Sequence, residues 1–533
     1  MCVKLHWIVV ASLVVVGGCG GGDGSTGSTG GTGSGGSGSG GTGGSWTAGV
    51  FEPSSSFQSQ CATPRTGIDP TTGRRYPDVQ GSTLTENRFL RSWTNELYLW
   101  YSEVPDLNPA SYSTPSYFAV LKTTATTPSG NPKDRFHFTY PTAQWVALSQ
   151  SGVEAGYGAQ FLLIASRPPR SIRVAYTEPG SPATTPPANL ARGATVLAVD
   201  GVDAVNAADS ASVATLNEGL FPSQAGASHT FSILDAGASV PRTITMVSAD
   251  VTSTPVQNVG TINVPGGRVG YMLFNDHLAT SEQGLVNAFR QLAAANVTDL
   301  VVDVRYNGGG YLDIASEAAY MIAGPGPTAG RTFEKTVFSD KHQTRDPVTG
   351  ELIVPVPFYS TSQDFSVPSG QALPTLNLSR VILLTGANTC SASESIINGL
   401  NGVGVQVIQI GSTTCGKPYG YYPQDNCGTT YFSIEFKGVN HQGFGDYPDG
   451  FSPVNATGPV GVQIPGCAVA DDLEHALGDP AEARLSAALG YLASGTCPAA
   501  SAVPAAAAGD QAPLLGEGSL YRSPWRENRI LRR

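Results

Sequence analysis

The chain has 533 residues, of which 13% are charged, and its formal net charge is -11. This length is enough for two or three domains, each with its own core. An acidic chain with few charged residues lacks the basic face that nucleic acids require, so we expect no nucleic-acid partner.

The first 18 residues have the pattern of an export signal. Lys4 precedes an apolar run over residues 7–16, which is short for a transmembrane helix. The run ends in V-G-G-C at Cys19, which resembles a bacterial lipobox and implies cleavage before Cys19 and acylation of that cysteine. A plain secretory signal that is cut elsewhere is the alternative. No Asp follows Cys19, so by analogy we expect a lipid anchor in the bacterial cell envelope, at the outer membrane and facing the periplasm or the cell surface.

The next two segments differ in composition. Residues 19–50 are dominated by Gly, Ser and Thr and predict a flexible tether without a core. Residues 51–150 predict a mostly helical region, with helices over residues 86–101 and around residues 116–122. The first of these carries an aromatic stripe at helical spacing, which is typical of a buried face: Phe89, Leu90, Trp93, Leu97 and Trp100.

Residues 151–255 change to short apolar runs separated by Pro and Gly. The sequence G-Y-G-A at residues 156–159 precedes an apolar strand over residues 161–164. This order resembles a PDZ domain. The resemblance implies that main-chain N–H groups of Tyr157, Gly158 and Ala159 bind a chain-terminal carboxylate, and that the next strand accepts a peptide by β-addition. A β-rich spacer with an empty groove is the alternative.

Residues 256–498 alternate between strand and helix patterns. Strands are predicted at residues 269–273 and 300–304, and helices at residues 282–295 and 312–322. The run L-V-V-D-V at residues 300–304 is almost wholly apolar, as in a strand buried on both faces. This succession of strand, helix and strand predicts an α/β fold with a mixed, mainly parallel sheet.

Two turns in this region carry the residue types needed for nucleophilic catalysis. Ser391 follows a predicted strand at residues 381–385 and opens a helix, and Lys417 follows the next strand at residues 405–410. In a parallel sheet both turns lie at the carboxyl ends of neighbouring strands, where α/β active sites gather. A serine needs a neighbouring base, and a lysine can act as one when burial lowers its pKa. A helix-capping serine and an ordinary surface lysine are the alternatives.

Three signatures in this order resemble the tail-specific, or C-terminal processing, peptidases of family S41. They are D-V-R-Y-N-G-G-G at residues 303–310, S-A-S-E from Ser391, and G-K ending at Lys417. The resemblance implies a serine peptidase with a ClpP/crotonase-like core, with Ser391 as nucleophile and Lys417 as general base. It also implies an oxyanion hole formed by the N–H groups of Ala392 and a residue of the glycine run; we favour Gly309, with one position either way open. No cofactor or metal is expected.

The sequence departs from the family pattern near the lysine. Tyr421 stands where the family often has Gln, and Cys415 stands where it has Phe. The lysine is therefore expected to use different orienting partners. His441, in a turn-rich loop, is a further candidate base, although a lone loop histidine is more often incidental.

Six cysteines follow Cys19, and an even number in an exported chain predicts disulfides. They are Cys61, Cys390, Cys415, Cys427, Cys467 and Cys497. We favour a Cys415–Cys427 bridge, and a Cys390–Cys415 bridge across adjacent strand ends is the competing pairing. The spacing fits no zinc template.

Residues 499–533 are rich in Ala and then in Arg, and predict a disordered tail. We therefore interpret the chain as a lipid-anchored serine endopeptidase that acts on exported or unfolded polypeptides. A catalytically idle module that binds chain termini through the PDZ-like groove is the main alternative, and an esterase that uses the same Ser–Lys pair is a second one.

Overall fold

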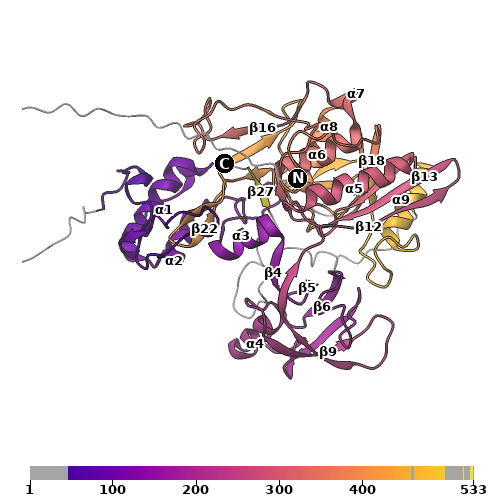
Figure 1. The fold of residues 1–533 in the computed structure, drawn as a ribbon, viewed down its shortest axis with the longest axis horizontal. Helices are drawn as coiled ribbons and strands as arrows, with labels where there is room; N and C mark the ends of the chain where they lie inside the picture. The colour runs from indigo at the N-terminus through magenta and orange to yellow at the C-terminus, as the bar shows by residue number, and fades with distance from the viewer. Residues whose placement is uncertain (1–45, 458–460, 499–519, 521–527, 532–533) are drawn as a thin grey trace, which may run out of the picture. The chain divides into compact units, whose positions relative to one another are not determined.

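The computed structural model describes residues 46–457, 461–498, 520 and 528–531 (Figure 1). The predicted export signal, Cys19 and nearly all of the predicted tether lie outside the described residues. Within the part of the chain that is described, no helix combines the length and apolar character needed to cross a membrane.

The N-terminal region contains the two predicted helices, α1 (Thr83–Leu97) and α2 (Thr114–Val120). Ser82 caps α1 because its hydroxyl accepts a hydrogen bond from the N–H of Thr85. Phe89, Leu90 and Trp93 of the predicted stripe are buried and pack in one cluster with Phe118 of α2, whereas Leu97 is half-buried and Trp100 lies beyond the end of α1 and is half-buried. The remaining elements of this region are η1 (Ser54–Ser56), β1 (Gln60–Cys61), β2 (Val79–Gln80), η2 (Tyr101–Glu103), η3 (Pro109–Ser111), β3 (Phe138–Pro141) and α3 (Thr142–Ser151).

A β-rich region follows, and its main sheet is antiparallel with the strand order β10-β9-β7-β6-β5. Its elements are β5 (Ala159–Ala165), β6 (Ser171–Thr177), β7 (Thr195–Val199), β8 (Val202–Asp203), α4 (Ser210–Leu220), β9 (Ser228–Leu234) and β10 (Arg242–Val247). A separate pair joins β4 (Val153–Gly156) to β11 (Ala249–Thr252). Strand β5 lies at one end of the order, so one of its edges has no partner strand within this sheet.

The central sheet has the strand order β12-β13-β14-β18-β19-β26. Only the pairing of β12 with β13 is antiparallel, so the predicted mixed and mainly parallel sheet is confirmed. The strands are β12 (Val256–Val264), β13 (Gly267–Phe274), β14 (Asp299–Asp303), β18 (Arg380–Thr385), β19 (Gln406–Gly411) and β26 (Gly466–Ala468).

Helices cover both faces of this sheet, which explains why its strands are almost continuously apolar. Alternate strand residues such as Val302 and Leu383 share one core with α5 (Ser281–Ala294), α6 (Leu312–Ala323) and α8 (Ala392–Gly402). Residues of the opposite face, such as Val301, pack with α9 (Ala483–Ser494) and with side chains of β5 and β6.

Several short strands form smaller sheets outside the central one. A four-stranded sheet has the order β17-β16-β23-β20, and a three-stranded sheet has the order β21-β22-β3. The elements are β15 (Gly309–Tyr311), α7 (Pro325–Thr328), β16 (Thr332–Phe338), β17 (Val356–Pro357), β20 (Tyr419–Gly420), β21 (Gln424–Asn426), β22 (Thr429–Phe432), β23 (Phe436–Val439), β24 (Phe451–Pro453), β25 (Val462–Ile464) and β27 (Asn528–Ile530). Strand β27 falls in the segment for which composition predicts disorder, and at these residues the structure differs from that prediction.

The favoured Cys415–Cys427 bridge is wrong. The disulfides are Cys61–Cys427, Cys390–Cys415 and Cys467–Cys497. Cys427 lies in the turn between β21 and β22, whose sheet continues into the N-terminal region through β3, and it reaches Cys61 there. Cys415 instead follows β19 and meets the turn after the neighbouring β18, as the competing pairing requires. Three disulfides indicate an oxidising, extracytoplasmic location.

Candidate active site

Three turns meet at the carboxyl ends of three adjacent parallel strands. Residues 307–310 follow β14, Ser391 follows β18, and Lys417 follows β19. Parallel strands end at the same edge of a sheet, and this shared edge brings the turns together. The Cys390 N–H donates to the Asn307 carbonyl oxygen at 3.0 Å, which joins the first turn to the second.

Ser391 is fully buried and occupies the residue just before α8. Its backbone has φ 59° and ψ -113°, a conformation that residues other than glycine rarely adopt. Backbone strain of this kind persists only where the surrounding structure enforces it, and it is concentrated at functional sites. The helix that follows leaves the Ala392 N–H without a hydrogen-bond acceptor among the residues the structure describes.

Glu394 joins the serine turn to the lysine turn. Its carboxylate Oε2 accepts hydrogen bonds from the Ser391 N–H at 2.9 Å and from the Lys417 N–H at 2.8 Å. Both bonds end on one atom, so the two main-chain nitrogens lie within about 6 Å of each other. Oε1 accepts from the Gly416 N–H at 2.8 Å and from the Thr414 hydroxyl at 2.6 Å. The whole carboxylate is therefore used to hold the two turns in place.

Sequence reasoning did not assign this role to Glu394. A signal was present, because S-x-x-E at the start of a helix is the capping-box pattern, in which the Glu bonds back to the N–H of the cap residue. Burial raises the pKa of Glu394 above its ordinary value, and its four hydrogen bonds act in the opposite direction.

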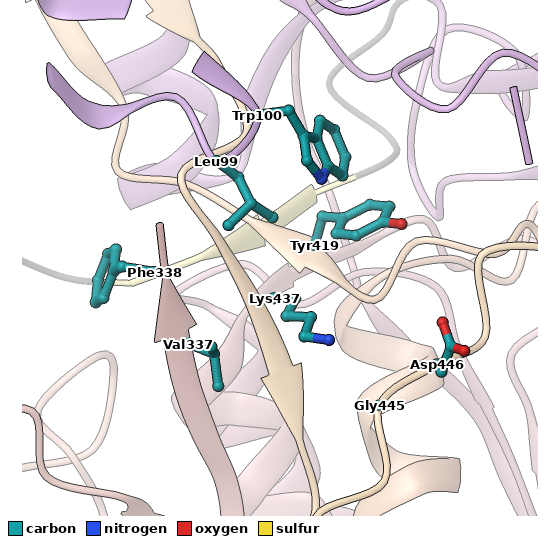
Figure 2. Close-up of a pocket in the computed structure, with 8 residues that line it drawn as sticks. All are labelled: Leu99, Trp100, Val337, Phe338, Tyr419, Lys437, Gly445 and Asp446. Atoms are coloured by element: carbon teal, nitrogen blue, oxygen red, sulfur yellow. The ribbon is translucent and has the colours of Figure 1, made fainter. Parts of the chain in front are cut away.

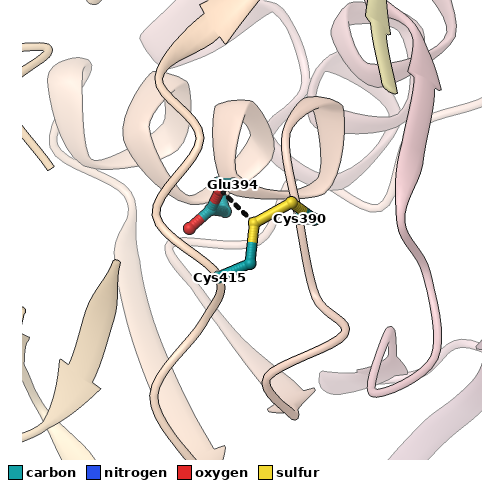
Figure 3. A group of neighbouring side chains, drawn as sticks. All are labelled: Cys390, Glu394 and Cys415. Atoms are coloured by element: carbon teal, nitrogen blue, oxygen red, sulfur yellow. Dashed lines mark hydrogen bonds between the residues drawn. A yellow bond between two sulfur atoms is a disulfide. The ribbon is translucent and has the colours of Figure 1, made fainter. Parts of the chain in front are cut away.

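A disulfide joins the same two turns covalently (Figure 3). Cys390 directly precedes Ser391, Cys415 lies two residues before Lys417, and their Cα atoms are 5.1 Å apart. The Cys415 sulfur lies 3.6 Å from Glu394 Oε2. The two cysteines and Glu394 are close enough to suggest a metal site, but metals bind the thiolate form, and both sulfurs are committed to the disulfide.

Lys417 is fully buried among aromatic side chains. Its Nζ atom lies 4.8 Å from the centre of the Phe136 ring and 4.5 Å from that of the Tyr421 ring. It also donates to the Tyr421 hydroxyl at 3.5 Å. Tyr421 stands where the resemblance leads one to expect Gln, so a tyrosine orients the amine in this chain.

The glycine turn is organised by the buried side chain of Asn307. Its Oδ1 atom is 3.0 Å from the Gly309 N–H and 3.0 Å from His277 Nδ1, and its amide donates to the Phe274 carbonyl. Gly310 has φ 139°, and a Cβ atom there would lie 2.5 Å from the His277 carbonyl oxygen. Glycine is thus required at this position by both conformation and space.

This arrangement bears on the predicted oxyanion hole. The Gly309 N–H, which we favoured, already donates to Asn307. The Gly308 N–H has no acceptor within the described ranges. Gly308 directly precedes Gly309, so it is one of the two neighbouring positions that the prediction left open.

Comparison with known proteins agrees with this geometry. Residues 268–422, which contain all three turns, match the model of peptidase family S41. The chain contains an S41 peptidase domain. The prediction of an S41-family serine peptidase is therefore confirmed at the level of the family. No curated protein sequence matches the chain significantly.

Solved structures of similar fold include a protein named as an S41 protease from Bacteroides fragilis NCTC 9343. It is 23% identical with a TM-score of 0.54, and the match covers 79% of this chain and 98% of that one. A photosystem II D1 C-terminal processing protease matches at 19% identity and a TM-score of 0.41, over 72% and 94% of the two chains. Mature CPAF complexed with lactacystin matches at 11% identity and a TM-score of 0.36, and the match covers 70% of this chain and 92% of that one. The first of these shows that the fold is shared.

The D-V-R part of the first S41 signature has a structural role. Arg305 is buried, and its guanidinium bonds Asp303 at 2.9 Å, Asp471 at 2.7 Å and Glu482 at 2.7 Å. These carboxylates hold the pKa of Arg305 well above its ordinary value despite burial. Arg192 of the β-rich region binds the same Asp471 at 2.7 Å. The network fixes the strand end from which the glycine turn starts and links it to the β-rich region.

The three residues predicted to bind a carboxylate lie in the β-rich region. The Tyr157 side chain is buried in the core of that region, Gly158 has φ 73°, and Ala159 begins β5. The carbonyl groups of Tyr157 and Gly158 accept hydrogen bonds from the N–H groups of Ala183 and Glu178. This loop belongs to a different apolar cluster from Cys390 and Tyr421, so the structure does not bring it into the serine–lysine site.

A cavity of about 220 Å³ opens near the lysine turn (Figure 2). Its lining includes Trp100, Tyr419, Lys437 and Asp446, and neither Ser391 nor Lys417 is part of it. Tyr419 lies two residues beyond Lys417, so this cavity adjoins the turn that carries the lysine.

The candidate base His441 is exposed, and its Nδ1 atom accepts a hydrogen bond from the Thr332 N–H, so it takes no part in the site.

Proposed function

We propose that the chain is a serine endopeptidase in which Ser391 is the nucleophile and Lys417 is the general base. The observation that carries this proposal is the pair of hydrogen bonds by which Ser391 and Lys417 share one oxygen of Glu394. The adjacent Cys390–Cys415 disulfide supports it, because it restricts the same two turns. Catalysis needs the reacting groups to be held in place before the substrate arrives.

In the first half of the reaction, Ser391 Oγ attacks a peptide carbonyl carbon and its proton passes to the neutral amine of Lys417. The tetrahedral intermediate then collapses, the C–N bond breaks, and the lysine gives its proton to the leaving amine. In the second half, water attacks the acyl-enzyme ester and gives a proton to Lys417. The new acid leaves, and the proton returns to Ser391.

The surroundings of Lys417 suit a base. Lys417 is fully buried beside the Phe136 and Tyr421 rings, so its amine is shielded from bulk water. The Tyr421 hydroxyl supplies a hydrogen-bond partner that fixes the direction of the amine.

The oxyanion hole would consist of the Ala392 N–H and one N–H of the glycine run. Gly309 is the residue expected from the sequence, and the bond from its N–H to Asn307 favours the neighbouring Gly308 within the same window. Both N–H groups would donate to the oxygen that becomes negative in the tetrahedral intermediate.

We further propose that the substrates are exported or unfolded polypeptides and that the chain is anchored by lipid on Cys19 at the outer membrane. The disulfides and the lipobox-like sequence support this location. We also propose that the β-rich region, residues 151–255, is a PDZ-like domain that binds peptide ends through Tyr157, Gly158 and Ala159. The edge of β5 that has no partner strand in the described sheet supports that role because β-addition needs such an edge.

The test is cleavage of an unfolded protein by the wild type, Ser391→Ala and Lys417→Ala. Either substitution is expected to lower the rate by at least about 1,000-fold. Lys335→Ala, which changes a lysine in β16, is the matched control and should cleave like the wild type. Equal cleavage by all four proteins would overturn the serine–lysine pair. Binding without cleavage by any of them would favour the catalytically idle PDZ-type module.

A further inference from the structure

Strand β27 comes from the end of the sequence and pairs with the glycine strand of the proposed active site. The pairing is parallel, with Gly309 opposite Asn528, Gly310 opposite Arg529 and Tyr311 opposite Ile530. The other edge of β15 is bridged to His277. Strand β27 therefore occupies the edge of β15 that is not already bonded to the core.

The same segment also bonds to the lysine turn. Ile530 forms a parallel bridge with Tyr421, and the Leu531 N–H donates to the Tyr421 carbonyl at 3.4 Å. Strand β27 contacts α8 as well, the helix that begins beside Ser391. The segment thus lies between the glycine strand and the lysine turn and against the helix that begins beside Ser391.

Ile530 is the anchor of this segment. Its side chain is 3% exposed and lies in one apolar cluster with Leu278, Cys390 and Tyr421. Burial of a branched aliphatic side chain of this size stabilises docking substantially. The cluster includes the cysteine that precedes the nucleophile and the tyrosine that bonds the lysine, so the Ile530 pocket borders the catalytic groups.

A second residue near the end of the sequence docks elsewhere. Leu520 is fully buried in the apolar cluster of the β-rich region, together with Tyr157 and with Leu216 of α4. The final segment of the chain therefore places one aliphatic side chain in each of the two regions proposed to bind peptide.

We infer that the edge of β15 binds an extended peptide by parallel strand addition, with a branched aliphatic side chain at the position of Ile530, and that residues 528–531 are its resident ligand. The inference rests on the proposed function only for its effect on cleavage. A polypeptide substrate must displace β27 before it can pair with this edge. If β27 occupies the edge in nine of ten molecules, its release strengthens apparent peptide binding about tenfold.

The experiment measures binding of a fluorescent peptide with the sequence of residues 523–533 to the full-length protein. It is carried out in the Ser391→Ala background so that no cleavage interferes. Ile530→Asp in the same background places a charge in an apolar pocket, releases β27, and is expected to raise the affinity for the added peptide about tenfold. Val240→Asp, at an apolar side chain that is 74% exposed, is the control and should leave the affinity unchanged.

Two further measurements keep the test decisive. Ile530→Ala is expected to act in the same direction with a smaller gain, so the inference does not depend on tolerance of a buried charge. A peptide that carries Asp in place of its isoleucine should bind at least tenfold more weakly. Equal binding of the first peptide to the Ser391→Ala protein with and without either Ile530 substitution would overturn the inference, and so would failure of that peptide to bind any variant.

Cleavage assays in the Ser391-containing protein separate this inference from the proposed function. If Ile530→Asp tightens peptide binding while no variant cleaves, the inference stands and the peptidase proposal fails. If the wild type cleaves and Ile530→Asp changes neither cleavage nor binding, the peptidase proposal stands and the inference fails.

Discussion

The serine–lysine side of the proposed active site and its glycine side are held by different kinds of bonds. On the first side, a disulfide and a carboxylate with four hydrogen bonds join the turns of Ser391 and Lys417. On the second side, a neutral hydrogen bond from the Gly309 N–H to Asn307 and pairing with strand β27 hold the glycine strand. The two residues proposed to react are thus held by a disulfide and a carboxylate, whereas the glycine strand is held by main-chain pairing with a segment that we infer a peptide can replace.

Among the changes that test this difference, removal of the Glu394 carboxylate should have the largest effect on kcat and stability. Glu394→Ala leaves four buried donors without their acceptor, each at a cost of about 1–3 kcal/mol. We expect kcat to fall by at least about 100-fold and the melting temperature to fall by several degrees. Steady-state kinetics and thermal unfolding measure the two effects.

Glu394→Gln separates positioning from folding. It keeps one acceptor oxygen but turns an NH2 group toward two of the four donors, so it should recover only part of the melting temperature while kcat stays low. An alanine variant with kcat within a factor of three of the wild type would contradict the role assigned to Glu394.

Loss of the Cys390–Cys415 disulfide should have an intermediate effect. Cys390→Ala/Cys415→Ala frees the two turns from each other and is expected to lower kcat about tenfold with little change in KM. The double variant Cys467→Ala/Cys497→Ala is the matched control, because the two bridges span 25 and 30 residues and restrict the unfolded chain to a similar degree. Both variants should therefore lose similar stability, and only the first should lose kcat. A similar kcat in the two variants would show that the first bridge does not position the turns.

The smallest expected effect lies on the glycine side and depends on pH. Complete burial lowers the pKa of His277 to about 3. The unfolded chain therefore binds a proton near pH 6.5 that the folded protein excludes, and stability is lost as the pH falls from about 6.5 towards 3. His277→Gln keeps a polar group beside Asn307 and should reduce the loss of unfolding free energy between pH 6.5 and pH 5 by about 1–2 kcal/mol. Urea unfolding at the two pH values measures this, and an unchanged loss would contradict the assignment.

The parts of the fold with strong local patterns could be predicted from the sequence. The apolar runs of β14, β18 and β19 and the helix after Ser391 define the sheet edge at which the site lies. The two turns with Ser391 and Lys417 follow from those strands, because parallel strands place their carboxyl ends side by side.

Other features depend on contacts between distant parts of the chain and could not be predicted. Cys427 pairs with Cys61 across 366 residues, and no local spacing indicates that partner. The composition around residues 528–530 is typical of disorder, and only pairing with β15 makes them a strand. The role of Tyr421 depends on how the lysine turn packs against Phe136. At such positions the sequence shows which residue is present, but only the folded structure shows which distant residue it contacts.

The most direct test of the central claim is covalent labelling with a fluorophosphonate, which reacts with activated serine hydroxyls. The reagent is applied to the wild type and to Ile530→Asp, each with and without Lys417→Ala, and the modified residue is located by mass spectrometry. The account predicts an adduct on Ser391 that forms faster when β27 is released and at least about 100-fold more slowly without Lys417. Labelling of Ser391 at the same rate with and without the lysine, or an adduct on a different serine, would contradict it.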